Sequence, residues 1–264
     1  MEQILAPVVF NRHLTGDYWL IEIEAPDIAA ALEPGQFVNI RIQNSLAPYL
    51  RRPFSVYRVS PDKRRLQVAY KIVGEGTLLM RDTMPTGGRC DVIGPLGKGF
   101  SLPSRAKRIA VVGRGIGIAA LPTLVDAAAE RGIEVHAFLS ARTRDNLVAE
   151  DIFAHYGFPV HAHTDQDSPG TLVTDPLEEL SRTQKIDAFY VCGSNRLARV
   201  VHGLAEAQNA PAEIAMEQHM ACGFGDCHGC VINVKLDADG PEETVWKEVC
   251  HYGPVFNTWE VLHA

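Results

Sequence analysis

The chain concentrates half of its cysteines in one short stretch, "ACGFGDCHGC" at 221–230, although it has only six cysteines in 264 residues. With one cysteine farther along the chain they give the spacing C-x4-C-x2-C-x19-C, at Cys222, Cys227, Cys230 and Cys250. Glycines separate them, and glycine lets a backbone follow a close, partly left-handed path around a bound group. The chain therefore has to fold so that a glycine-rich loop and the distant Cys250 meet at one place.

Such a loop can be a disulfide knot, a zinc site or an iron–sulfur site. The opening "MEQILAPVVFNRHL" lacks the basic and then apolar segments of an export signal. We therefore expect a cytoplasmic, reducing location, which disfavours disulfides. Zinc sites commonly pair two C-x2-C units, and this chain has one. The first three spacings match the plant-type [2Fe–2S] pattern, whose fourth ligand comes from farther along the chain. The pattern favours a [2Fe–2S] cluster, with zinc as the alternative.

The composition is that of a globular protein without a general affinity for polyanions. Hydrophobic residues make up 46% and charged residues 22% of the chain, whose length allows two domains and a small third. The net charge of −7 gives no general attraction to nucleic acid or anionic lipid. The most apolar window, 109–129, contains Arg114, Pro122 and Asp126. We expect a strand, a glycine turn and a helix there, and no membrane span.

The first region, residues 1–102, shows the pattern of an antiparallel β-barrel. Short runs rich in β-branched and aromatic residues are separated by Pro, Gly, Asn and Asp turns, with runs at 18–25, 35–42, 52–60 and 65–73. Two of these runs alternate apolar and polar residues, as strands with one solvated face do. The Gly/Pro/basic passage 94–108 is the expected seam to the next region.

The second region, residues 103–212, alternates strand patterns with helix patterns, which predicts a Rossmann-like parallel sheet covered on both faces. Strands are expected at 108–113, 133–142, 159–164 and 185–193. Helices are expected at 119–132, 144–157, 176–184 and 195–209. The third region, 213–264, holds the cysteine loop and a short hairpin. The prediction is a multidomain β plus α/β protein with a small C-terminal cluster domain.

The glycine turn "VVGRGIG" at 111–117 follows an expected strand and opens an expected helix. Its glycines give G-x-G-x-G, at Gly113, Gly115 and Gly117. Ile118 replaces the last glycine of the dinucleotide fingerprint. The turn can be an anion site at a helix N-terminus, or it can serve close packing. Cys192 and Gly193 end another expected strand at the same edge, where core packing and cofactor contact are both open.

Two stretches of the β region carry groups that bind a diphosphate. "RRPFSVYRV" places Arg51 and Arg52 beside Pro53, and "VGEGT" at 73–77 is a glycine turn that ends in Thr77. An arginine pair at the surface is usually only part of a solvated face. Together, glycine amides, a hydroxyl and an arginine fork are what a diphosphate requires. In a β domain ahead of an α/β domain they indicate a flavin.

The order of β-barrel, nucleotide domain and cysteine loop resembles the ferredoxin–NAD(P) reductase superfamily over nearly the whole chain. More narrowly, it is similar to the electron transfer subunits of NAD-dependent dihydroorotate dehydrogenases. "RPFS" at 52–55 is similar to that family's Arg-Pro-x-Ser flavin motif, and "VGEGT" to its Gly-x-Gly-Thr turn. "CGFGDCHGC" resembles its cluster loop. "VCHYGPVF" at 249–256 resembles the segment in which its fourth ligand is followed by Gly-Pro-Val-Phe.

The resemblance implies three cofactors and a partner. FAD would be held by Arg52, Pro53, Phe54, Ser55, Ala69, Tyr70, Lys71, Gly76 and Thr77. A [2Fe–2S] cluster would be held by Cys222, Cys227, Cys230 and Cys250. NAD(H) would meet the edge formed by Gly113, Gly115, Gly117, Cys192 and Gly193. In this family a catalytic subunit oxidises dihydroorotate to orotate on FMN, in a heterotetramer of pyrimidine biosynthesis. Electrons run from FMN through the cluster and FAD to NAD+.

One departure from the family concerns the pyridine nucleotide. The family usually shows Gly-Gly-Gly-x-Gly at this turn, and Arg114 replaces the second glycine, which leaves NAD and NADP open. Two other functions also stay open. One is the small subunit of an NADH-dependent ferredoxin:NADP+ transhydrogenase, although that family can use an aspartate as a cluster ligand. The other is a zinc-stapled interaction module that senses nucleotides.

Overall fold

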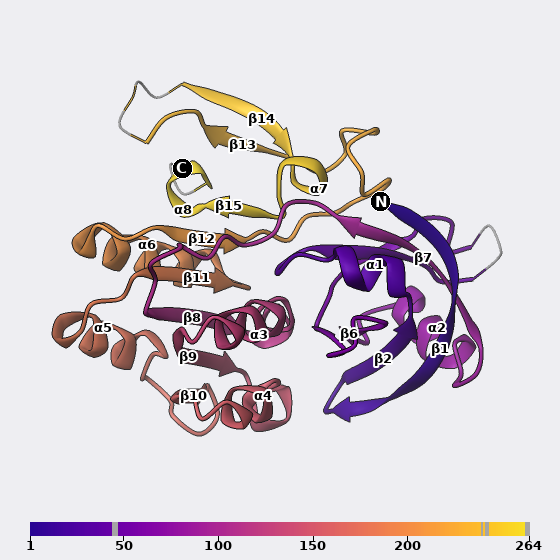
Figure 1. Cartoon of the computed structure of the whole chain (residues 1–264), viewed down its shortest axis with the longest axis horizontal. Coiled ribbons are helices and arrows are strands. Elements are labelled where there is room, and N and C mark those ends of the chain that lie inside the picture. The colour runs from indigo at the N-terminus through magenta and orange to yellow at the C-terminus, as the bar shows by residue number, and fades with distance from the viewer. Residues whose placement is uncertain (44–46, 239, 241–242, 262–264) are drawn as a thin grey trace.

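The computed structural model describes residues 1–43, 47–238, 240 and 243–261. Its first part is a seven-stranded antiparallel sheet in the order β4-β3-β7-β1-β2-β6-β5. The strands are β1 (Glu2–Thr15), β2 (Tyr18–Glu24), β3 (Phe37–Arg41), β4 (Arg52–Ser55), β5 (Arg58–Val59), β6 (Arg65–Lys71) and β7 (Arg89–Leu96). Only Val56 and Tyr57 separate the edge strands β4 and β5. The two edges therefore lie beside each other, and the sheet curls into the barrel on the right of Figure 1.

The barrel contains elements that the sequence patterns did not predict. β1 is 14 residues long and includes Pro7, where it changes partner. Residues 2–7 pair with β7, and residues 8–15 pair with β2. A proline has no N–H to donate, so it is tolerated where the pairing of a strand is interrupted. Two helices complete the region, α1 (Pro26–Ala31) and α2 (Glu75–Thr83). The predicted β region is thus a barrel with two added helices.

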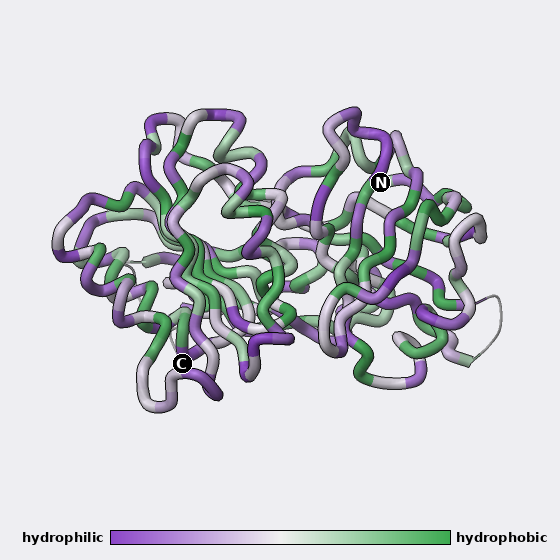
Figure 2. Tube along the Cα trace, turned by 90° about the horizontal axis from the view of Figure 1, so that it is seen from below, coloured by the Kyte–Doolittle hydropathy of each residue, from purple (hydrophilic) through white to green (hydrophobic). Residues whose placement is uncertain are grey.

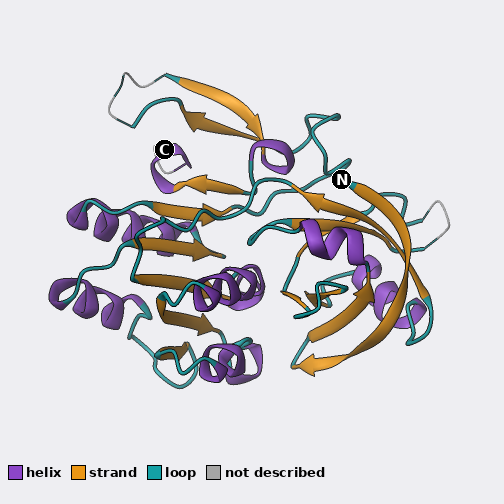
Figure 3. Ribbon diagram, viewed as in Figure 1, coloured by secondary structure: helices purple, strands orange, loops and turns teal. Residues whose placement is uncertain are grey.

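The second sheet has six strands in the order β10-β9-β8-β11-β12-β15, of which the first five are parallel. They are β8 (Arg108–Arg114), β9 (Glu134–Ala141), β10 (Val160–Thr164), β11 (Ala188–Cys192), β12 (Ala212–Ala215) and the antiparallel β15 (Val255–Asn257). The connections hold η1 (Gly115–Ala120), α3 (Pro122–Glu130), η2 (Arg144–Asn146), α4 (Glu150–His155), α5 (Thr174–Thr183) and α6 (Asn195–Gln208). Figure 3 shows helices on both sides of this sheet, which confirms the predicted α/β fold.

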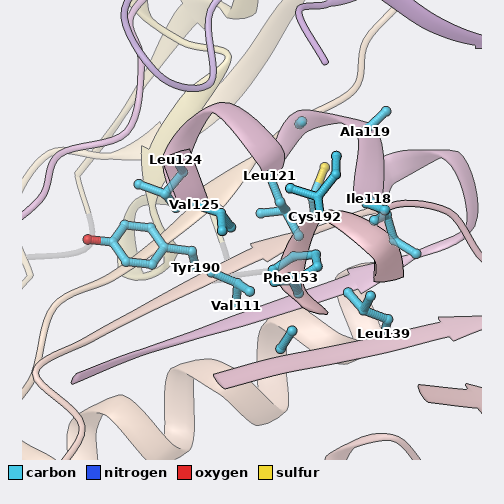
Figure 4. Close-up of a cluster of buried hydrophobic side chains, with 14 of the residues drawn as sticks. Val111, Ile118, Ala119, Leu121, Leu124, Val125, Leu139, Phe153, Tyr190 and Cys192 are labelled. Atoms are coloured by element: carbon cyan, nitrogen blue, oxygen red, sulfur yellow. The ribbon is translucent and has the colours of Figure 1, made fainter. Parts of the chain in front are cut away.

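Side chains of the α/β strands alternate between two apolar layers. Val111 faces the layer formed with α3 and α4, whereas its neighbour Val112 faces the layer formed with α5 and α6. Figure 4 shows the first layer, in which Leu124 of α3 and Phe153 of α4 lie over the strands. In Figure 2 the central strands are mostly hydrophobic and the surrounding helices are mixed. A strand buried on both faces explains the continuous apolar run that predicted β8.

The C-terminal part packs on the edge of the α/β sheet. β13 (Val231–Lys235) and β14 (Thr244–Glu248) form an antiparallel hairpin at the top of Figure 1, and α7 (Val249–Tyr252) and α8 (Thr258–Val261) flank β15. β12 runs across the predicted limit between residues 212 and 213. The division into domains 1–102, 103–212 and 213–264 stays a prediction. Among the described residues, no helix combines the length and the apolar character that a membrane span requires.

Candidate functional site between the barrel and the sheet

A cavity of about 350 Å³ lies where the barrel meets the carboxyl edge of the α/β sheet. This volume is within the range of small-molecule sites. Nine predicted residues from five separate stretches line it, namely Pro53, Phe54, Ser55, Ala69, Tyr70, Lys71, Thr77, Gly117 and Cys192. The fold therefore brings the two predicted flavin stretches and the glycine edge to one place.

Strands β4 and β6 build the barrel side of the cavity and hold its aromatic side chains rigidly. The rings of Phe54 and Tyr70 pack edge to face with centroids 6.1 Å apart. The Tyr70 hydroxyl donates a hydrogen bond of 2.9 Å to Asn11 Oδ1. Burial raises the pKa of Tyr70 to about 12, so the hydroxyl stays protonated at neutral pH. Lys71 adds a cation to this wall.

Arg52 and Gly76 lie against each other beside the cavity. A Cβ atom at Gly76 would be 3.1 Å from Arg52 Nε, so the guanidinium rests on the backbone at the start of α2. The first N–H groups of a helix have no intrahelical acceptor. Thr77 Oγ1 accepts hydrogen bonds from the N–H groups of Val73 and Gly74 at 2.9 and 3.3 Å. The Thr77 hydroxyl therefore fixes the turn at residues 73–74, directly before the first N–H groups of α2.

The glycine turns after β8 and β11 touch each other. A Cβ at Gly117 would lie 2.7 Å from the Cα of Gly193, and a Cβ at Gly193 would lie 2.6 Å from the Arg114 carbonyl oxygen. Gly115 and Gly193 have φ angles of 56° and 96°, in the left-handed region that favours glycine. Gly113 is in contact with the next turn through Ile118. Close backbone packing therefore requires these glycines, and the 3₁₀ helix η1 replaces the expected start of an α-helix.

Cys192 combines the two roles that the sequence left open. The side chain is buried in the apolar layer of Figure 4 and also lines the cavity. Its thiol donates to the carbonyl oxygen of Ala215 on the neighbouring strand at 3.7 Å. Burial raises the pKa of this thiol far above its usual range, so it is a neutral, apolar part of the wall.

Arg114, which departs from the family pattern, points to the end of β10. Its guanidinium donates to both carboxylate oxygens of Asp165, at 3.2 and 2.7 Å. The Arg114 hydrogen bond lowers the pKa of Asp165. The pair is at the surface of the carboxyl edge, with 37% and 54% of the two side chains exposed. This ion pair keeps the guanidinium on Asp165 while the backbone of the glycine turn stays at the cavity.

The four cysteines of the predicted cluster site come together as two pairs. The thiol of Cys227 hydrogen-bonds the sulfur of Cys222, and the thiols of Cys230 and Cys250 contact each other in the same way. Backbone N–H groups also reach the sulfurs, from Gly225 to Cys250 at 3.1 Å and from Cys250 to Cys230 at 3.4 Å. All six cysteines lie in the described residues, and none forms a disulfide.

The electrostatics of the two pairs differ. Partial burial raises the pKa of Cys222, but N–H groups of the loop and the Cys227 thiol outweigh it and lower the pKa to about 6. Burial and the adjacent Cys230 raise the pKa of Cys250 to about 12. Within the described part of the chain, no group of three or more His, Cys, Asp or Glu side chains has the geometry to hold a metal ion. The two-by-two arrangement instead suits a dinuclear cluster, in which each iron takes two cysteines.

Sequence reasoning missed the segment that connects the cavity with the cysteine loop. Residues just before the cysteine loop line the cavity, at Met216, Glu217, Gln218 and Met220. Phe37 of β3 lines it too. A cavity whose wall continues within two residues into Cys222 brings a flavin-type pocket and the cysteine loop close together. In the sequence, the signal for this segment is that only a few residues separate the end of β12 at Ala215 from Cys222. Only the fold shows that these residues line the cavity.

The comparisons with known proteins agree with this arrangement. Residues 217–262 match the iron–sulfur cluster binding domain of dihydroorotate dehydrogenase B. The electron transfer subunit of dihydroorotate dehydrogenase B (NAD(+)) from Desulforamulus reducens is 34% identical over 246 residues, 92% of each chain. The corresponding subunit from Bacillus caldolyticus is 37% identical over 235 residues, 87% of each chain. The chain belongs to this family of electron transfer subunits.

Solved structures support the fold of this electron transfer subunit. The structure of an NADH-dependent reduced ferredoxin-NADP oxidoreductase has a TM-score of 0.82 and 27% identity, covering 98% of this chain and 90% of that one. Phthalate dioxygenase reductase has a TM-score of 0.66 and 18% identity, covering 93% and 76%, and shows a shared fold alone. The predicted ferredoxin reductase type of architecture is confirmed.

Proposed function

We propose that this chain passes electrons from the catalytic subunit of dihydroorotate dehydrogenase B to NAD+, with FAD in the cavity and a [2Fe–2S] cluster on the four cysteines. The observation that carries the proposal is the shared wall. The flavin motif, the glycine edge and the segment leading into Cys222 all line one cavity. Electrons pass efficiently only between carriers held close together, and this arrangement brings the three sites together in one short chain.

The described residues fit FAD. The cavity is bounded by the aromatic pair Phe54 and Tyr70 and by the apolar Cys192, which suits a planar ring system. Arg52 resting on the start of α2 offers a cation beside helix N–H groups, and these are the donors that a diphosphate takes. Lys71 and Ser55 add polar groups at the rim of the same strands. These residues would hold FAD, exclude water from its ring and fix its orientation.

The cysteine loop fits an iron–sulfur cluster. Four sulfur donors and few competing side chains give the ligand set of a four-thiolate site. Backbone N–H groups already point at the sulfurs of Cys222, Cys230 and Cys250, and such donors stabilise thiolate charge. Gly223 and Gly225 have φ angles of 85° and 93°, which lets the loop turn its amides inward. The four cysteines would hold the cluster in this loop.

The glycine edge would receive the nicotinamide cofactor. A flavin can exchange one or two electrons, so when bound it connects a hydride carrier with a one-electron cluster. The chain's own part is to bring the carriers together. The turns of Gly117 and Gly193 touch each other, and the edge reaches the cavity at Gly117 and Cys192, where a nicotinamide ring can approach. We assign Gly113 and Gly115 to the shape of this edge, since neither lines the cavity.

The partner subunit follows from the relatives, which are named as electron transfer subunits of dihydroorotate dehydrogenase B. Dihydroorotate would be oxidised on that partner, and the activity of this chain would depend on it. A heterotetramer is the assembly we expect. We also propose a cytoplasmic location, where reducing conditions would keep Cys90 and Cys192 as thiols and leave the other four cysteines able to bind iron.

Anaerobic purification of the chain with and without its partner tests the proposal. We expect one FAD, two irons and two acid-labile sulfides per chain, and NAD+-linked oxidation of dihydroorotate only when both subunits are present. Serine variants of Cys222 and Cys250 are expected to lose iron while keeping flavin. A preparation with zinc and no iron or sulfide would contradict the proposal, as would turnover of dihydroorotate by this chain alone.

A second candidate function has one observation in its favour. The NADH-dependent reduced ferredoxin-NADP oxidoreductase structure matches nearly the whole chain. A subunit of such an enzyme would exchange electrons with ferredoxin in place of dihydroorotate. Reduction of the purified complex by dihydroorotate, compared with reduction by ferredoxin, separates the two functions.

A further inference from the structure

Asn39 is a polar residue buried at the junction of the barrel and the cysteine loop. It lies on β3 with 1% of its surface exposed. Its side-chain Nδ2 donates a hydrogen bond of 2.7 Å to the carbonyl oxygen of Cys222, the first cysteine of the loop. Its Oδ1 is buried and has no hydrogen-bond partner among the described residues. Burial of the unpaired Oδ1 costs free energy. The hydrogen bond from Nδ2 to Cys222 is the interaction that offsets this cost.

The loop is shaped to receive this amide. Gly223, next to Cys222, has a φ angle of 85°. A Cβ at this position would collide with Nδ2 of Asn39, so the backbone of the loop lies directly on the side-chain amide. Glycine at 223 thus serves two needs, the left-handed turn and the close approach of Asn39.

The same strand also reaches the cavity. Phe37, two residues before Asn39, lines the cavity, and residues two apart on a strand point to the same face. In the sheet, Asn39 is directly opposite Pro53 of β4, which belongs to the "RPFS" stretch on the cavity wall. β3 therefore contacts the proposed flavin site and the first proposed cluster ligand through side chains on one face.

We propose that Asn39 is a positioning residue that fixes Cys222 against the strand pair carrying the flavin motif. The inference rests on the proposed function, because it concerns the spacing between the two cofactor sites. Loss of the donor would free the carbonyl of Cys222 and loosen the first turn of the loop. The cluster would then be held less tightly, and its electronic environment would change.

Substitution of Asn39 by leucine tests this, because leucine has nearly the same shape and no donor. For Asn39→Leu we expect about tenfold faster loss of iron to a chelator, as for other residues that orient metal ligands. We also expect a shifted electron paramagnetic resonance spectrum of the reduced cluster, while the FAD content stays unchanged. The matched control is Val38→Ala. Val38 is the neighbouring residue on β3 and is fully buried in the apolar core of the barrel, a cluster that contains no residue of the cysteine loop.

The outcomes separate this inference from the function on which it rests. Iron loss and a shifted spectrum in Asn39→Leu but not in Val38→Ala support the positioning role. A wild-type spectrum and wild-type iron retention in Asn39→Leu overturn it, as do equal changes in Val38→Ala, which would show general destabilisation of the barrel. A wild-type protein that holds no iron and no sulfide overturns the proposed function and the inference together.

Discussion

Gly117 is one of the residues at which the two turns of the glycine edge touch each other. A Cβ there would meet the Cα of Gly193 at 2.7 Å, and neither backbone can move aside without shifting a strand end. We expect Gly117→Ala to lower the free energy of unfolding by about 1–3 kcal/mol through overpacking. Because Gly117 lines the cavity, the variant should also retain less FAD. Thermal unfolding and the flavin content of purified protein measure the two effects.

Gly203 offers the matched control for this substitution. It lies in the middle of α6, and a Cβ there would have no atom within 4 Å. Alanine has a better helix propensity than glycine, so Gly203→Ala should raise the free energy of unfolding by up to about 1 kcal/mol. Equal behaviour of the two variants would contradict the close packing of Gly117 and Gly193.

Single residues could be predicted where their chemistry marks them. The cysteine spacing and the "RPFS" stretch identified side chains that the fold brings together at the loop and at the cavity. The sequence could not show whether the glycines at 113–117 bind a ligand or allow close packing, because both a ligand-binding loop and a tight backbone contact require glycine. Asn39 could not be predicted either. Its partner Cys222 is 183 positions away, and a lone asparagine in a strand has no pattern.

At the scale of elements, one ion pair fixes the barrel against helix α3. Arg58 of β5 donates to both carboxylate oxygens of Asp126, at 3.1 and 2.8 Å, and the Tyr156 hydroxyl donates to the same carboxylate at 2.8 Å. We expect Asp126→Ala to lower the free energy of unfolding by about 1.5–3 kcal/mol, as for hydrogen bonds to charged groups. Urea denaturation measures the loss.

A surface pair on the same barrel is the comparison for Asp126. Glu24 and Arg64 have 40% and 59% of their side chains exposed. Exposed pairs contribute little, so Glu24→Ala should cost less than about 1 kcal/mol. If Glu24→Ala lowers the free energy of unfolding as much as Asp126→Ala does, the ion pair between the barrel and α3 contributes no more than a surface pair.

Strand β12 carries a carboxylate that makes stability depend on pH. Burial raises the pKa of Glu213 above its ordinary 4.5, although the N–H and hydroxyl of Ser101 donate to it and partly offset the rise. Above the ordinary pKa the folded state therefore binds more protons than the unfolded state, and the free energy of unfolding falls as pH rises through this window. Relative to Glu213→Gln, the wild type should lose Tm as pH rises from about 4.5 towards neutral. A constant difference in Tm across this range would refute the effect.

Elements could be predicted where one periodicity holds over the whole segment. The apolar run of β8 and the alternation in β2 and β3 give strands at the expected places. β1 was missed because Pro7 and polar residues interrupt its pattern, and it is held by two partners in succession. The short α2 was missed because its glycines indicate a turn, and they do form the turn at its start. β15 joins the sheet by tertiary pairing with β12, which no local pattern encodes.

At the scale of the molecule, hydrogen bonds join the barrel, the connecting passage and the α/β sheet at several places. The Gly35 N–H donates to Thr123 Oγ1 at 3.2 Å, and Thr15 Oγ1 donates to the Asp145 carbonyl at 3.1 Å, both between barrel and α/β sheet. The Tyr190 hydroxyl donates to the carbonyl of Ser101 in the connecting passage at 2.6 Å. Such hydrogen bonds hold the barrel and the α/β sheet in one relative position. A relay of electrons needs this rigidity, because its rate depends on the spacing of the carriers.

The cysteine loop also carries an exposed aromatic side chain. Phe224 lies between the first two cysteines and leaves 42% of its surface exposed, while its N–H faces the sulfur of Cys222. Exposed aromatic side chains are frequent anchors of interfaces. If the partner subunit docks over this loop, Phe224→Ser should weaken its binding by about tenfold or more without loss of iron or FAD.

The control for Phe224 is Leu172, which is 41% exposed and lies before α5 in the α/β part of the chain. Leu172→Ser should bind the partner as the wild type does. Equal dissociation constants for both variants, measured with immobilised catalytic subunit, would place the docking surface elsewhere.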